Sequence, residues 1–116
     1  MATSERMKHG LPLRVYVEAP EADVDMLFAA VTHSIEAGAI PYSRELTFGH
    51  LPITQAQQVL MAYEHSDGFD EVWLFMDEEA DHGQHMAVSA AQDKGLPRRF
   101  FTTAPNVPFV EIGYMT

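Results

Sequence analysis

The segment that most constrains the fold is 71–76, which reads Glu-Val-Trp-Leu-Phe-Met. It consists largely of β-branched, aromatic and long aliphatic residues, and in an extended chain both of its faces are apolar. A strand that is apolar on both faces is typical of the interior of a parallel sheet, where helices cover the two sides. The segment therefore predicts a central parallel strand in an α/β domain, with Trp73 and Phe75 as core residues.

Strand and helix patterns alternate around this segment. Helices are predicted from the acidic stretch after Pro20 to Gly38, from Thr54 to the Asp67-Gly68 pair, and from near Asp81 to Lys94, with a loop over 43–52. Strands are predicted at 13–18, 39–42 and 97–103, with 109–114 as a candidate fifth. This alternation favours right-handed βαβ units. We expect a three-layer, flavodoxin-like or Rossmann-like parallel sheet of four to five strands flanked by helices.

The length of 116 residues predicts a single domain. The first ten residues are polar and lack the apolar core of a signal peptide, so we expect 1–10 to be a flexible tail and 11–116 to be one α/β domain. No run approaches the ~20 apolar residues of a membrane span. A cytoplasmic protein is the simplest interpretation.

Composition excludes several function classes. There is no cysteine, which rules out disulfides, thiolate zinc sites and a catalytic thiol. The formal net charge is −10, which disfavours binding to duplex nucleic acid, because such binding depends on Lys and Arg at the phosphates. The same charge disfavours anionic membrane surfaces.

The loops that follow the predicted strands are where a parallel sheet binds ligands. The loop after the first strand, 18–22, contains no glycine, so neither a dinucleotide-binding fingerprint nor a P-loop is present. No serine lies in a G-x-S-x-G nucleophile elbow. An ordinary Rossmann dehydrogenase, a P-loop nucleotidase and a serine hydrolase are therefore poor fits.

The loop after the central strand is rich in acids and histidines: Asp77, Glu78, Glu79, Asp81, His82 and His85. Such a patch can ligate a divalent metal ion. Its spacing matches no specific metal motif, and a solvated acidic loop with a capping Asp explains it as well. We therefore predict no metal site and no cofactor.

Three blocks of the chain resemble a known superfamily. They are the stretch 15–20, similar to "VYVASP"; the stretch 36–41 with Leu46, similar to "AGAIPxxPHL"; and the stretch 70–75 followed by Gly83 and by 94–97, similar to "CDEVWVFG … SxGMxxE … GIPV". In this order and spacing they resemble the nucleoside 2-deoxyribosyltransferase-like superfamily, especially its small uncharacterised bacterial and phage members. The resemblance covers roughly residues 13 to 101 and implies a flavodoxin-like fold that often forms dimers.

The catalytic positions implied by this resemblance are altered. The family's nucleophile is a Glu four residues beyond the glycine, and the equivalent position from Gly83 is Ala87. The His of the "PHL" block falls at Glu45, the Pro before it at Arg44, and the Ser of the "SP" pair at Ala19. The double-displacement mechanism therefore cannot run from Ala87.

The resemblance also implies a set of site residues. Tyr16 and Pro20 would shape the pocket for sugar and base, although Tyr16 can equally be a residue packed beneath a helix. Asp77, Asp81 and Gly83 would line the ribose side. Glu45, Glu18 or one of Glu78, Glu79 and Asp81 could replace the lost acid. Glu45 and Asp81 are the catalytic candidates, and Glu18 is expected to bind the ligand.

The function that follows is binding of a nucleoside or nucleotide derivative by a divergent and inactive relative of the deoxyribosyltransferases. Two alternatives remain open. One is an active N-glycosidic hydrolase or transferase with a relocated carboxylate. The other is a small interaction protein that binds no small molecule. A homodimer is compatible with all three.

Overall fold

The computed structural model describes residues 10–20, 23–48, 52, 54, 57, 69–76, 82–102 and 109–115. In chain order these residues form β1 (Arg14–Glu18), α2 (Val24–Glu36), β2 (Ile40–Tyr42), α3 (Arg44–Phe48), β3 (Glu71–Met76), α5 (His82–Lys94), β4 (Arg98–Thr102) and β5 (Val110–Met115). The predicted central strand coincides with β3, and the other four strands lie within one residue of their predicted bounds.

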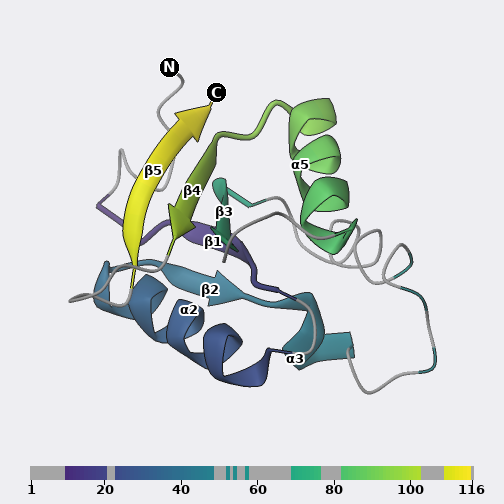
Figure 1. The fold of residues 1–116 in the computed structure, drawn as a ribbon. Coiled ribbons are helices and arrows are strands. Elements are labelled where there is room, and N and C mark those ends of the chain that lie inside the picture. Colours follow the sequence, from purple (N-terminus) through teal and green to yellow (C-terminus); the bar gives the residue numbers. More distant parts are fainter. Residues whose placement is uncertain are drawn as a thin grey trace.

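The five strands form one sheet in the order β2-β1-β3-β4-β5 (Figure 1). β2, β1, β3 and β4 run parallel, whereas β5 is antiparallel to β4. The expectation of an all-parallel sheet is therefore wrong for β5. A parallel return would need a crossover of about a dozen residues or more, and only the segment 103–109 separates β4 from β5.

Helices α2 and α5 lie on opposite faces of this sheet (Figure 1). Alternation along the strands explains the division, because successive side chains point to opposite faces. The α2 face carries Val15, Val17, Trp73, Phe75 and Phe101, against which Met26, Leu27 and Ala30 of α2 pack. The α5 face carries Tyr16, Val72 and Leu74, covered by Ala87 and Ala91. The prediction of Trp73 and Phe75 as core residues is confirmed.

Helix α2 begins and ends where local chemistry predicts. The carboxylate of Asp23 accepts a hydrogen bond from the backbone N–H of Met26 at 3.0 Å and caps the helix. The chain leaves the helix through Gly38, whose φ of +85° lies in the left-handed region that favours glycine. Gly38 therefore acts as the predicted C-terminal stop.

We expect Asp23→Ala to lower the free energy of unfolding by about 1 kcal/mol, because it removes an N-cap hydrogen bond. The measurement is a urea unfolding curve. Asp25→Ala is the matched control, since Asp25 is an exposed acid in the first turn of the same helix and is not the cap. Equal losses in the two variants would mean that charge, rather than capping, stabilises this end of α2.

The prediction of a loop over 43–52 is wrong at residues 44–48, which form α3. The hydroxyl of Ser43 accepts a hydrogen bond from the backbone N–H of Leu46 at 3.3 Å and caps this short helix. Thr54, where a helix is predicted to begin, forms a reciprocal cap with Gln57: the Gln57 N–H donates to Thr54 Oγ1 at 3.2 Å, and the Thr54 N–H donates to Gln57 Oε1 at 2.9 Å. The remainder of the helix predicted after them lies outside the described residues.

The expected flexible tail also lies outside the described residues, apart from Gly10. Among the helices that the structure describes, none has both the length and the apolar character needed to cross a bilayer.

Candidate functional site

The candidate site lies at the carboxyl ends of β1 and β3. β2 lies beside β1 on one side, and the chain then returns to place β3 beside β1 on its other side. In open α/β sheets, the place where the strand order reverses in this way is where ligands bind, just beyond the carboxyl ends of the strands. Glu18, the last residue of β1, occupies this place.

Glu18 is the centre of a buried polar network. Its carboxylate accepts hydrogen bonds from Arg44 Nε, at 2.9 Å to each oxygen, and from the Tyr16 hydroxyl, at 3.1 Å to Oε2. The side chains of Glu18 and Arg44 are only 2% and 1% exposed. The guanidinium thus compensates the carboxylate inside the protein, where an isolated charge is strongly destabilising.

Local structure brings these three side chains together. Tyr16 and Glu18 are two residues apart on one strand and so share a face. β2 lies beside β1 with Tyr42 opposite Tyr16, and α3, which starts two residues after the end of β2, places Arg44 beside Glu18. Glu18 and Arg44 lie 26 positions apart in the sequence, and one helix and one strand connect them.

Tyr16, a member of this network, also belongs to an aromatic cluster with Tyr42 and Phe69. The ring of Tyr16 stacks on Tyr42 with the centroids 6.3 Å apart, and contacts Phe69 edge-on at 5.2 Å. Tyr16 is fully buried on the α5 face. The interpretation of Tyr16 as a residue packed beneath a helix is therefore confirmed, although its hydroxyl also holds Glu18.

The start of α5 is hydrogen-bonded to β3 near the carboxyl ends of the strands. Gln84 is fully buried, and its side-chain amide donates a hydrogen bond of 2.7 Å to the carbonyl oxygen of Phe75 near the end of β3. Gly83 beside it is also buried. Ala87, where the resemblance would place a nucleophile, is fully buried against the sheet among apolar side chains.

The structure places only part of the predicted site. It brings Tyr16 and Glu18 into hydrogen-bond contact. Pro20 is half-buried and lies just beyond the end of β1, and Gly83 lies at the start of α5. Glu45 lies in the first turn of α3, but the position of its side chain is not described. Asp77 and Asp81 lie outside the described residues.

Sequence reasoning assigned no role to Arg44 or Gln84. Arg44 was noted only as a departure from a family motif, and no feature of the sequence links it to Glu18. Its position in the loop predicted after the strand 39–42 was the one available signal, because loops at strand ends carry function disproportionately. Gln84 gave no signal, since a polar residue in the first turn of a helix is ordinarily solvated.

A second polar cluster lies on the α2 face, near the amino ends of β3 and β4. Arg99 donates hydrogen bonds to Glu71 at 2.7 Å and to Glu111 at 2.8 Å, and its guanidinium lies 4.4 Å from the centroid of the Tyr114 ring. Partial burial lowers the pKa of Arg99, but these hydrogen bonds and charges outweigh the burial and hold the pKa above its ordinary value. The indole N–H of Trp73 also donates to Glu71, at 2.8 Å.

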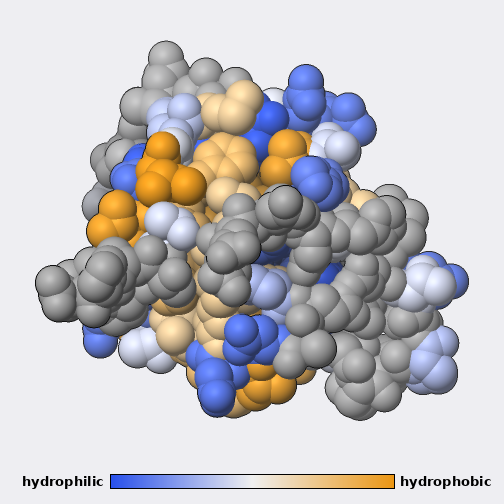
Figure 2. Space-filling model, viewed as in Figure 1, coloured by the Kyte–Doolittle hydropathy of each residue, from blue (hydrophilic) through white to orange (hydrophobic). Residues whose placement is uncertain are grey.

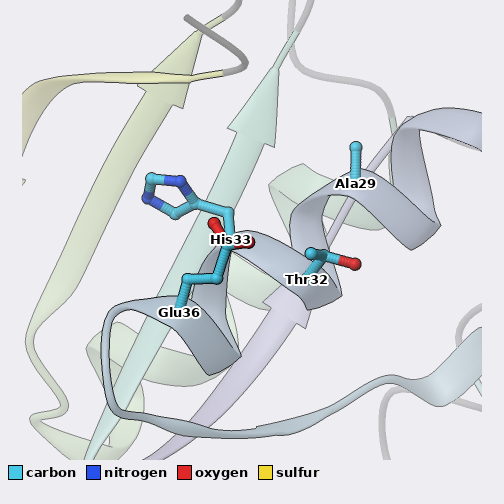
Figure 3. Close-up of a pocket in the computed structure, with 4 residues that line it drawn as sticks. All are labelled: Ala29, Thr32, His33 and Glu36. Carbon is cyan, nitrogen blue, oxygen red and sulfur yellow. The ribbon is translucent and has the colours of Figure 1, made fainter.

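A small pocket of about 240 Å³ opens on the flank of α2, lined by Ala29, Thr32, His33 and Glu36 (Figure 3). The ring of His33 lies edge-on to Phe75, Phe101 and Phe109, with centroids 5.2 to 5.7 Å apart. These contacts place His33 on the α2 face, whereas Tyr16 lies on the α5 face. The pocket is therefore separate from the candidate site. In the part of the chain that the structure describes, no three acidic or histidine side chains are grouped to hold a metal ion.

No protein-family model matches the chain, and searches of curated proteins and of solved structures find no similar protein. The resemblance to the deoxyribosyltransferase-like superfamily therefore rests on the three sequence blocks.

Proposed function

We propose that this chain binds a nucleoside or nucleotide derivative at the carboxyl edge of its sheet and does not cleave it. The observation that carries the proposal is the buried network of Glu18, Arg44 and Tyr16 at the place where the strand order reverses. The order β2-β1-β3-β4-β5 supports a flavodoxin-like interpretation of the fold, with β5 reversed.

The family resemblance supports the same site. In the "VYVASP" block Glu18 stands in place of Ala, and in the "PHL" block Arg44 stands in place of Pro. These two departures lie in different segments of the chain, yet their side chains form one buried ion pair. The carboxylate and the guanidinium compensate each other in the interior of the protein, so the two departures are physically coupled.

Three features favour binding over catalysis. Both carboxylate oxygens of Glu18 are engaged by Arg44, so this acid is held as a structural ion rather than as a proton donor or nucleophile. Ala87 provides no carboxylate and faces the core. The His of the family's "PHL" block is replaced by Glu45. The remaining route to chemistry is a relocated acid at Glu45 or Asp81.

The proposal is tested by thermal-shift measurements with nucleosides, deoxynucleotides, NAD and ADP-ribose. We expect at least one of these ligands to raise the melting temperature, and Tyr16→Phe to weaken its binding about tenfold, a loss of about 1.4 kcal/mol. This variant keeps the ring and removes the hydroxyl that orients Glu18. Tyr42→Phe is the matched control, since Tyr42 belongs to the same aromatic cluster.

Each ligand that binds is then incubated with the protein and assayed for released base. Release that is lost in Glu45→Gln or Asp81→Asn would replace the binding proposal by an N-glycosidase with a relocated acid. Failure of every ligand to stabilise the chain would contradict the proposal and leave the interaction protein as the remaining candidate.

A further inference from the structure

Helix α2 has two apolar sides. The side that packs on the sheet carries Met26, Leu27 and Ala30. The second apolar side, called the α2 stripe below, lies about 120° further round the helix axis. It consists of four residues: Val24, Phe28, Val31 and Ile35. The α2 stripe therefore faces away from the sheet.

The α2 stripe is largely exposed. Val24, Phe28 and Ile35 are 56%, 54% and 59% exposed, and Val31 is half-buried. Figure 2 shows hydrophobic and hydrophilic side chains next to each other along the lower border of the molecule, where Figure 1 draws α2. A single exposed apolar residue is ordinary, but a continuous row rimmed by polar residues is typical of an interaction site.

The spacing of the α2 stripe selects a helix as the binding partner. Its residues follow one another at intervals of four, three and four, which is the spacing of the apolar seam of a coiled coil. Such a seam receives the side chains of a second helix between its own. α2 has 13 residues and is about 20 Å long, so the stripe matches about three turns of a partner helix.

The charges beside the α2 stripe select a basic partner. Asp25 and Glu36 are both exposed and lie on the same flank of the stripe, about 100° further round the helix axis. α2 contains no Lys or Arg. The chain as a whole has a formal net charge of −10. Complementary charges across an interface attract the correct partner and disfavour partners of like charge.

The pocket on the flank of α2 adds a place for one basic side chain. Ala29, Thr32, His33 and Glu36 line it, and they share one side of the helix by their spacing (Figure 3). Its volume is about 240 Å³. Lys and Arg have an apolar stem and a charged end. The pocket offers a methyl group and a ring to the stem, and the Glu36 carboxylate to the charge.

We propose that the α2 stripe is a docking surface for a basic amphipathic helix of another protein. The apolar side of that helix packs on the stripe, and its Lys or Arg residues face Asp25 and Glu36, with one of them in the pocket. Pairing of two copies through this stripe would bring the same acids together without a cation, between chains that each carry a charge of −10. α2 covers the sheet face opposite to that of Tyr16, so this inference does not depend on the proposed ligand.

Fluorescence anisotropy tests the proposal with three synthetic peptides of about three heptads each. The basic peptide carries Leu at heptad positions a and d and Lys at e and g. The acidic peptide has Glu in place of each Lys, and the scrambled peptide keeps the basic composition without the apolar seam. In about 0.15 M salt, where the screening length is about 8 Å, we expect the full chain to bind the basic peptide with a Kd of about 10 µM. The other two peptides should bind at least about tenfold more weakly.

Ile35→Gln and Ile112→Gln are a matched pair of variants. Their side chains are 59% and 57% exposed, and Ile112 lies on β5, outside the α2 stripe. We expect Ile35→Gln to raise the Kd of the basic peptide at least about tenfold, and Ile112→Gln to leave it within about threefold. The double variant Asp25→Lys/Glu36→Lys should prefer the acidic peptide, because it reverses the charge beside the stripe. Far-ultraviolet circular dichroism checks folding, and Phe28→Gln replaces Ile35→Gln if the latter is unfolded.

Four results would overturn the proposal. One is the absence of saturable binding of the basic peptide up to about 1 mM. Another is equal affinity for the basic and scrambled peptides, which would assign binding to net charge alone. A third is an Ile112→Gln variant that binds as weakly as Ile35→Gln. The last comes from sedimentation velocity: a dimer that Ile35→Gln converts to a monomer would assign the stripe to a second copy.

Discussion

Arg44→Met is expected to lower the free energy of unfolding by about 3–5 kcal/mol, because it leaves the Glu18 carboxylate buried without its compensating charge. Glu18 is 2% exposed, so water cannot replace the lost partner without rearrangement of the site. Small domains are stable by about 5–15 kcal/mol in total, so this loss is a large fraction of the stability. The measurement is a urea unfolding curve read by tryptophan fluorescence from Trp73.

The double variant Glu18→Leu/Arg44→Met distinguishes a buried charge from lost packing. Replacing both members of a buried ion pair by apolar residues of similar size is often neutral or stabilising. We therefore expect the double variant to recover most of the stability that Arg44→Met loses, and to lose ligand binding under the proposed function. A double variant as unstable as Arg44→Met would mean that the aliphatic packing of Arg44, rather than its charge, matters most.

Phe75→Ala is expected to cost about 3–5 kcal/mol, because it removes a large buried side chain and leaves a cavity. Phe75 is fully buried in β3. Its ring stacks on Phe101 at a centroid distance of 4.6 Å and meets Phe109 edge-on at 4.8 Å. His33 of α2 contacts the same ring. The substitution therefore weakens the packing of α2, β4 and the start of β5 against the central strand.

Phe28→Ala is the control for this prediction. Phe28 lies on α2 but is 54% exposed, so its truncation creates no enclosed cavity. We expect a change in unfolding free energy within about 0.5 kcal/mol, as for most surface substitutions. Both variants are measured by urea unfolding at one protein concentration, so that self-association does not enter the comparison. Equal losses would show that Phe28 is buried in solution, as it would be in an interface on α2.

The candidate site was predictable only in part. The family resemblance implied Tyr16 and Glu18 as site residues, and the structure brings them into hydrogen-bond contact. The ion pair with Arg44 was not predictable, because the segment around it was expected to be a loop. A short helix of five residues leaves little periodicity to read, and only its cap at Ser43 marks it.

The sequence by itself determined most local elements that the structure describes, with α3 as the exception. Apolar periodicity and β-branched runs specified the strands, Asp23 and Gly38 marked the limits of α2, and strand–helix alternation specified a largely parallel sheet. These features depend on residues that lie close together in the chain. The tertiary structure alone decided which distant groups meet. The side chain of Glu18 forms an ion pair with Arg44, which lies in another segment of the chain. β5 runs antiparallel to β4, because the segment 103–109 is too short for a crossover. Such contacts follow from how the elements pack in space, and no local pattern encodes them.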